Sequence, residues 1–302
     1  MVSLINTGFQ YREKSVVTDV KSNCYTYHDY CKVAYEETLD FYPLRVLEKL
    51  RDGGFSYIST HAGTLVPLYK QFIAHRNDRA CKDLFVDFFA FFEHSLVLVC
   101  DLVGSIAKSL EVEIGDLPTH KGNGSPSPAV MIGWLRDAFS DLRSKSLDFL
   151  AFEHFFCDGS QYDDLSAYFV DASFEFKEFR NIKIHEKLGF SLEDYDLMIP
   201  FIFRILDFLS IFASTNVIFQ PRRIGKSWMF DCTQLNDRFP STQQIECDEG
   251  DFKTEKEEDL SREAVLMNVP AIGFIELSSN YSVSRDENTR VQKLAFLPWY
   301  SK

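Results

Sequence analysis

Apolar residues recur every three or four positions through most of the first two thirds of the chain. This spacing predicts helices at about residues 33–50, 60–74 and 79–110. The third run is apolar on nearly every side, so we expect it to form the buried spine of a helical bundle. Glu93 and His94 interrupt that spine, and we interpret them either as hydrogen-bonded core residues or as support for a functional site.

Three later runs predict further helices at about residues 129–149, 162–179 and 191–212. Gly189 breaks the pattern between the last two. Ser191 and the two acidic residues that follow Leu192 have the composition of a helix N-terminus, because a serine hydroxyl caps free backbone N–H groups and acids suit the helix dipole there.

From about residue 220 the pattern changes to short β-prone runs, at residues 228–230, 264–267, 271–277 and 291–297. A basic turn at 221–226 precedes them, and we expect the acidic loop 246–263 to be solvated, with a docking surface as the alternative. The predicted organisation is an N-terminal arm with short extended segments (1–33), a helical domain (34–218) and a β-rich C-terminal region (219–302). The fold class is mainly α, α+β overall.

Composition narrows the range of functions. The longest apolar runs in the 302 residues carry charged side chains, and the N-terminus lacks a basic start followed by an apolar stretch, so we expect neither a membrane span nor a signal peptide and favour a cytoplasmic protein. The seven cysteines form no Cys-x-x-Cys pair and no cluster with histidine. We therefore expect no disulfide framework, no metal site and no cofactor.

The net charge of −13 argues against broad binding to duplex DNA. The excess is uneven, however, because residues 246–263 hold nine acids against three bases. Residues 172–189 hold three acids against four bases, so a local phosphate site near them is compatible with the overall charge.

The most distinctive polar segment lies between two of the predicted helices and reads Phe179-Arg180-Asn181-Ile182-Lys183-Ile184-His185-Glu186. An arginine fork suits phosphate oxygens, and histidine exchanges protons near neutral pH. In a helix Asn181 and His185 share one face, whereas Arg180 points about 140° away from His185. Either the long Arg180 side chain reaches back, or a second copy of the chain supplies the missing group.

With Arg180, Asn181 and His185 in this setting, residues 34–218 resemble the HEPN superfamily. Its signature is Arg, four to six residues, then His, commonly with Asn, Asp or His directly after the Arg. The resemblance implies a HEPN-like helical bundle that acts as a metal-independent endoribonuclease. It also implies a homodimer through the helical domain, whose two motifs share one cleft, and a role in bacterial antiviral defence, such as abortive infection, or as a toxin.

Because RNA supplies its own nucleophile, the 2′-hydroxyl, the protein has to supply proton transfer and charge stabilisation. On this resemblance His185 transfers a proton, Arg180 stabilises the scissile phosphate, and Asn181 orients one or the other. Lys183 and Lys187 are candidates for attracting RNA.

Two other interpretations remain open. Arg180 and His185 can serve only to cap and pair at a helix junction. Alternatively, the chain can be a non-catalytic HEPN-like module that binds RNA, nucleotide or protein, with the β-rich region contacting a protein partner. Loss of activity without His185 would distinguish a ribonuclease from such a module.

Overall fold

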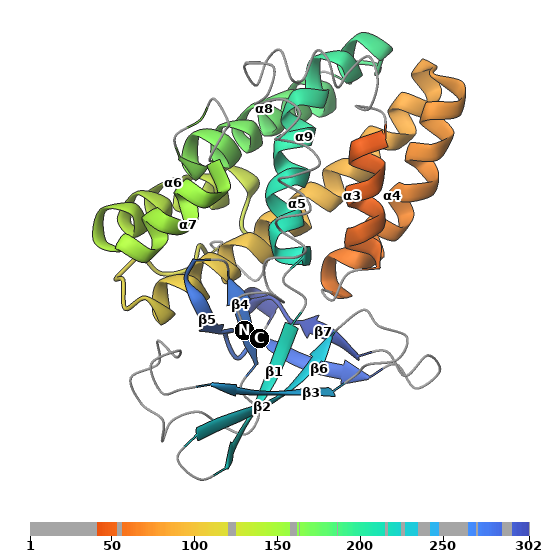
Figure 1. Ribbon diagram of the computed structural model, residues 1–302. Coiled ribbons are helices and arrows are strands. Elements are labelled where there is room, and N and C mark those ends of the chain that lie inside the picture. Colours follow the sequence, from red (N-terminus) through yellow and green to blue (C-terminus); the bar gives the residue numbers. More distant parts are fainter. Residues whose placement is uncertain are drawn as a thin grey trace, which may run out of the picture.

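The computed structural model describes residues 41–52, 56–119, 125–157, 162, 164–185, 187–214, 217–224, 227–234, 242–247, 265–269, 271–285 and 292–301. Within these ranges the chain is mainly helical, with short antiparallel strands towards its C-terminal end (Figure 1). The predicted class, mainly α with a β-rich C-terminal region, is therefore confirmed. The predicted N-terminal arm lies outside the described residues.

The helices fill the upper part of Figure 1. They are α3 (Phe41–Arg51), α4 (Ser56–His75), α5 (Asp78–Ser109), α6 (Pro128–Lys145), α7 (Leu147–Cys157), α8 (Asp171–His185) and α9 (Leu192–Ser214), with a short π-helix, η1 (Ser166–Val170), directly before α8.

The longest helix, α5, is the spine expected from its all-round hydrophobicity. It begins where the Asn77 side chain accepts a hydrogen bond from the Ala80 N–H at 2.9 Å. Most of its side chains are buried, and α4, α6, α9 and strand β5 (Gly273–Glu276) all contact it. A helix surrounded in this way needs apolar residues on every side, which is the pattern its sequence has.

The single helix predicted for residues 129–149 is wrong in its extent. Helix α6 ends at Lys145, and Ser146 has extended backbone angles, φ −131° and ψ 119°. Its hydroxyl accepts a hydrogen bond from the Phe149 N–H at 3.2 Å, which starts α7. Serine stabilises such a boundary because its side chain caps the free N–H groups of the next helix.

The strands form two sheets in the lower part of Figure 1. The five-stranded antiparallel sheet has the order β3-β2-β1-β4-β5, and β6 pairs with β7. Besides β5, the strands are β1 (Val217–Ile224), β2 (Ser227–Gln234), β3 (Thr242–Cys247), β4 (Leu266–Val269), β6 (Tyr281–Arg285) and β7 (Gln292–Phe296).

Strands β2, β4, β5 and β7 match predicted runs, whereas three other strands correct the prediction. Strand β1 includes most of the segment predicted as a basic turn, and β6 occupies a stretch predicted to separate strands. Strand β3 contains Glu246 and Cys247, the start of the predicted acidic loop, and the rest of that loop lies outside the described residues. In each case pairing with a neighbouring strand overrides a weak local signal.

The β-rich region is joined to the helices by buried polar groups on α5. Asp101 accepts hydrogen bonds from the Ser278 hydroxyl at 2.8 Å and from the Asn280 amide at 2.7 Å. One turn further along α5, the Ser105 hydroxyl accepts one from the Ser278 N–H at 3.1 Å. Apolar side chains of β4, β5 and β7 belong to the same hydrophobic core as the helices. The two parts therefore share a core.

Candidate functional site

The predicted motif lies in the last turns of α8, so its residues are helical. The buried face of this helix carries Phe176 and Phe179, whose rings pack against Phe89 of α5 with centroids 5.4 Å and 6.2 Å apart. The opposite face bears the exposed His185 and the partly exposed Asn181, four residues apart. The prediction that these two side chains share a face is confirmed, because α8 is continuous to His185.

Arg180 lies on the flank of α8, between the buried and exposed faces, and contacts α5. Its guanidinium forms an ion pair with Glu93, and the two side chains are 26 % and 36 % exposed. A second guanidinium nitrogen lies 3.4 Å from the Asn181 side-chain oxygen, whereas Nε is buried and has no hydrogen-bond partner among the described residues. Arg180 is thus held by one carboxylate and still has a donor without an acceptor.

The structure brings Arg180 close to Glu93 and Asn181, but not to His185 of the same chain. His185 is the last residue of α8, and it makes no polar contact with another residue in the described ranges. The divergence predicted from helical geometry is therefore present. A site that uses both side chains on one phosphate needs a second copy of the chain or a different imidazole.

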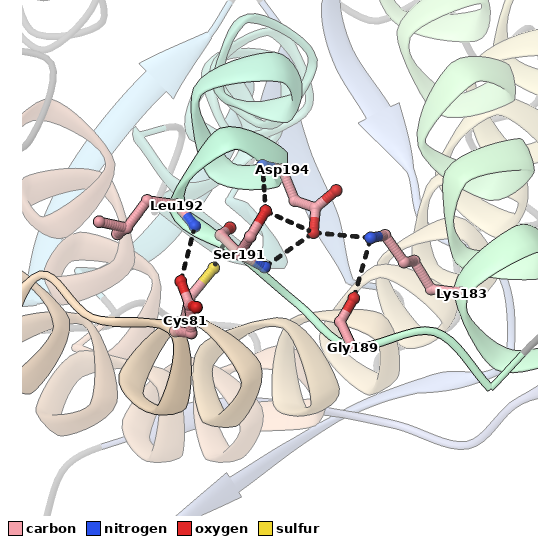
Figure 2. A network of polar contacts seen from close by, with 7 residues as sticks. Cys81, Lys183, Gly189, Ser191, Leu192 and Asp194 are labelled. Atoms are coloured by element: carbon pink, nitrogen blue, oxygen red, sulfur yellow. Dashed lines mark hydrogen bonds and ion pairs between the residues drawn. The ribbon is translucent and has the colours of Figure 1, made fainter.

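Lys183 takes part in the network that fixes the connection from α8 to α9, and Figure 2 shows this network. Its ammonium donates to the Asp194 carboxylate at 2.6 Å and to the Gly189 carbonyl at 2.9 Å. Asp194 also accepts from the Ser191 N–H at 2.8 Å, and the Ser191 hydroxyl accepts from the Asp194 N–H at 3.3 Å. The predicted N-cap at Ser191 is confirmed as a reciprocal capping pair.

The same network reaches α5 (Figure 2). Cys81 donates from its thiol to the Ser191 carbonyl at 3.0 Å, and Asp78 accepts from the Leu192 N–H at 3.2 Å. Burial, followed by nearby carboxylates, raises the pKa of the Cys81 thiol to about 12. Cys81 therefore stays a neutral, unreactive thiol at physiological pH.

Lys187, the second lysine assigned to RNA attraction, lies just beyond the end of α8. Its backbone is in the left-handed region, with φ 53°, where a helix commonly ends. Its side chain is exposed, so unlike Lys183 it projects its charge into solvent.

Glu93 and His94, which the sequence left open as a core pair or a supporting pair, contact different neighbours. Glu93 pairs with Arg180, so it is attached directly to the predicted site. The His94 ring contacts the tilted ring of His61 of α4, with ring centroids 3.9 Å apart. The polar interruption of the apolar spine at Glu93 indicated in the sequence that this residue could belong to a site, whereas nothing in the local sequence indicated that His61 lies beside His94.

Comparisons with protein-family models, with curated proteins and with solved structures gave no match for this chain. The resemblance to HEPN proteins thus rests on the motif and its helical setting. No set of three or more His, Cys, Asp or Glu side chains suited to a metal ion occurs among the described residues. Of the helices in the described ranges, none is long and apolar enough to cross a membrane.

Proposed function

We propose that this protein is a metal-independent endoribonuclease whose site is built from Arg180, Asn181 and His185 of two copies of the chain. The observation that supports this most is their placement on α8. His185 and Asn181 share an exposed face, and Arg180 lies on the flank of the same helix with a buried donor unused. An exposed imidazole and a partly exposed amide and guanidinium on one short helix segment suit a phosphodiester substrate.

The proposed reaction needs no metal ion. The 2′-oxygen forms a bond to phosphorus, the bond from phosphorus to the 5′-oxygen breaks, and a 2′,3′-cyclic phosphate results. One proton leaves the 2′-hydroxyl and another is given to the departing 5′-oxygen. His185 transfers one of these protons, and Arg180 stabilises the negative charge on the phosphate oxygens. Asn181 orients the imidazole or the phosphate by hydrogen bonding.

Exposed apolar side chains around the motif support a homodimer through α8. Ile182, Ile184 and Leu188 are 48 %, 47 % and 46 % exposed, and Phe174 on the outer face of α8 is 39 % exposed. Single exposed apolar residues are ordinary, but several on one helix end favour an interface. Two-fold pairing of this surface would place Arg180 of one copy towards His185 of the other, which removes the divergence within one chain.

RNA would be drawn to this interface by positive charge. Lys187 is exposed and unpaired by any described residue, so we assign it the main electrostatic role. Lys183 contributes through the local field, because its ammonium is already bound to Asp194 and Gly189.

The experiment is cleavage of a mixed single-stranded RNA by the full chain and by Arg180→Ala and His185→Ala. Matched controls are Arg136→Ala, at an exposed arginine of α6, and His75→Ala, at the exposed last residue of α4. We expect each site variant to lose about 10²–10⁴ in rate while both controls keep wild-type activity. Wild-type cleavage by both site variants would refute the proposal.

The cellular setting we propose is bacterial antiviral defence or a toxin system, in the cytoplasm, where RNA cleavage halts growth. Production of the protein in a bacterial host should then slow growth, and His185→Ala should relieve the effect. Equal toxicity of the two proteins would contradict this setting.

A non-catalytic binding module is the second candidate, and one observation favours it. Glu93 neutralises Arg180 within the chain, as expected for a structural ion pair. Such a module would retain its RNA or protein partner after His185→Ala, show no cleavage in the wild type, and use the β-rich region for a protein partner.

A further inference from the structure

Two histidines from different helices are in ring contact next to Glu93, the partner of Arg180. His61 of α4 and His94 of α5 have ring centroids 3.9 Å apart and planes inclined by 34°. Both side chains are partly exposed, and the ring of Tyr57 lies 5.3 Å from His94. We call His61 and His94 the imidazole pair.

One ring nitrogen of the pair is assigned by its hydrogen bond. His94 Nδ1 lies 2.7 Å from the Ala90 carbonyl oxygen. A carbonyl only accepts, so Nδ1 carries the hydrogen and donates it. The other nitrogen, Nε2, is therefore the atom of His94 that can take up or release a proton.

The imidazole pair and Arg180 lie on either side of one strip of α5. Glu93, which holds Arg180, precedes His94 directly, so their Cα atoms are about 3.8 Å apart and their side chains diverge by about 100° around the helix. Between these two directions lies the small, partly exposed Ala90, one turn earlier. The strip therefore has a guanidinium along one edge and two imidazoles along the other, with the Ala90 methyl group between them on one turn and the buried Val97 on the next.

The surroundings of His61 favour its neutral form. Burial, and next the neighbouring His94, lower the pKa of His61, while Asp87 of α5 opposes the shift. The other titratable groups close by are Glu93 on α5, Tyr57 on α4, and Tyr300, whose hydroxyl lies 3.5 Å from that of Tyr57. The neighbouring His94 adds to the lowering of the His61 pKa because positive charge on one ring disfavours positive charge on the other.

From this placement we propose that the imidazole pair is the general base for RNA cleavage and that Arg180 of the same chain holds the phosphate next to it. This inference rests on the proposed ribonuclease function. The pair takes the proton from the 2′-hydroxyl as the 2′-oxygen attacks phosphorus. His185 from the second copy gives a proton to the 5′-oxygen as its bond to phosphorus breaks. Base and acid then come from different helices, and the exposed His185 does not have to perform both steps.

The test is the pH dependence of kcat/KM for RNA cleavage by the full chain and by His61→Asn and His94→Asn, with His75→Asn as the matched control. We expect each pair variant to lose at least about 10² in kcat/KM, in the range of general base catalysis. In the wild type kcat/KM should fall as the pH drops below the usual histidine range, because the base becomes protonated. The residual activity of the His61→Asn/His94→Asn double variant, which lacks both imidazoles, should not show that fall, which a purely structural role would leave in place.

Wild-type rates and pH profiles in both pair variants, together with inactive Arg180→Ala and His185→Ala, would overturn this inference and leave the proposed function standing. Activity in all four variants would overturn both. If His94→Asn melts well below the wild type, His61→Asn decides alone, and a wild-type kcat/KM in that variant contradicts the inference. Added imidazole should partly restore cleavage by His61→Gly, and failure to do so while that variant stays folded also counts against it.

Discussion

Replacing Asp194 by alanine tests whether the α8–α9 connection is held as the structure indicates. The carboxylate of Asp194 accepts hydrogen bonds from Lys183 at 2.6 Å and from Ser191 at 2.8 Å and 3.2 Å. The side chains of Lys183 and Asp194 are 13 % and 15 % exposed, so the pair is mostly removed from water. Asp194→Ala therefore removes a helix cap and leaves the Lys183 charge with the Gly189 carbonyl as its remaining acceptor.

The magnitude follows from these two losses. A cap contributes about 1 kcal/mol, and breaking a buried ion pair costs about 3–5 kcal/mol, which the residual exposure here reduces. We expect Asp194→Ala to lower the free energy of unfolding by about 3 kcal/mol. At roughly 2–4 °C per kcal/mol for a chain of this order, Tm should fall by about 6–12 °C.

The assay is thermal and urea unfolding, with Glu193→Ala as the control, because Glu193 lies in the same first turn of α9 but is exposed. The free energy of unfolding of the control should fall by less than about 1 kcal/mol, the usual range for a charge at a helix N-terminus. The double variant Lys183→Met/Asp194→Ala should lose less stability than the two single variants lose together, since it no longer contains a buried lysine charge without a carboxylate partner. An Asp194→Ala variant as stable as Glu193→Ala would refute this account of the connection.

Three further predictions follow from the site. In sedimentation at micromolar concentration the wild type should be a dimer and Ile184→Asp a monomer. The control Leu147→Asp, which replaces an 83 % exposed side chain of α7, should stay dimeric. A wild-type monomer that cuts RNA would refute the shared cleft. Lys187→Glu should weaken RNA binding more at low salt than at high salt, and equal affinity at low salt would contradict its role. Because burial lowers the pKa of His61, the folded state binds fewer protons at this residue than the unfolded state, so its contribution to the free energy of unfolding is complete above about pH 6.5 and is lost as the pH falls. The free energy of unfolding of His61→Asn should therefore fall less steeply than that of the wild type between about pH 7 and pH 5. An equal slope in the two proteins would contradict this prediction.

The helices were predictable where the apolar period was long and uninterrupted. The α5 spine and the start of α9 at Ser191 both follow from local signals, namely a continuous apolar run and a capping serine. The break at Ser146 was missed because apolar residues continue on both sides of it, so the period alone showed no boundary. Strand β1 was missed since its Pro221-Arg222-Arg223 run has the composition of a turn, and its pairing with β2 and β4 is a tertiary effect.

The candidate site was predictable in its residues but only partly in its contacts. The sequence placed Asn181 and His185 on one face and Arg180 away from His185, which follows from helical geometry alone. It left the roles of Lys183 and Glu93 open, because their partners, Asp194 and Arg180, depend on how α8 packs against α9 and α5. His61 was missed because its position beside His94 results from the packing of α4 on α5, and sequence spacing carries no trace of that contact.

The proposed function is cleavage of RNA without a metal ion, through attack by the RNA's own 2′-hydroxyl. The most direct measurement is the chemical identity of the new RNA ends formed in excess EDTA, by the wild type and by the Arg180→Ala/His185→Ala double variant. We predict 2′,3′-cyclic phosphate and 5′-hydroxyl ends from the wild type, no such ends from the double variant, and no cutting of a substrate with 2′-deoxyribose at the scissile position. Cleavage that stops in EDTA and returns with magnesium, or equal cutting of the deoxyribose substrate, would contradict the claim.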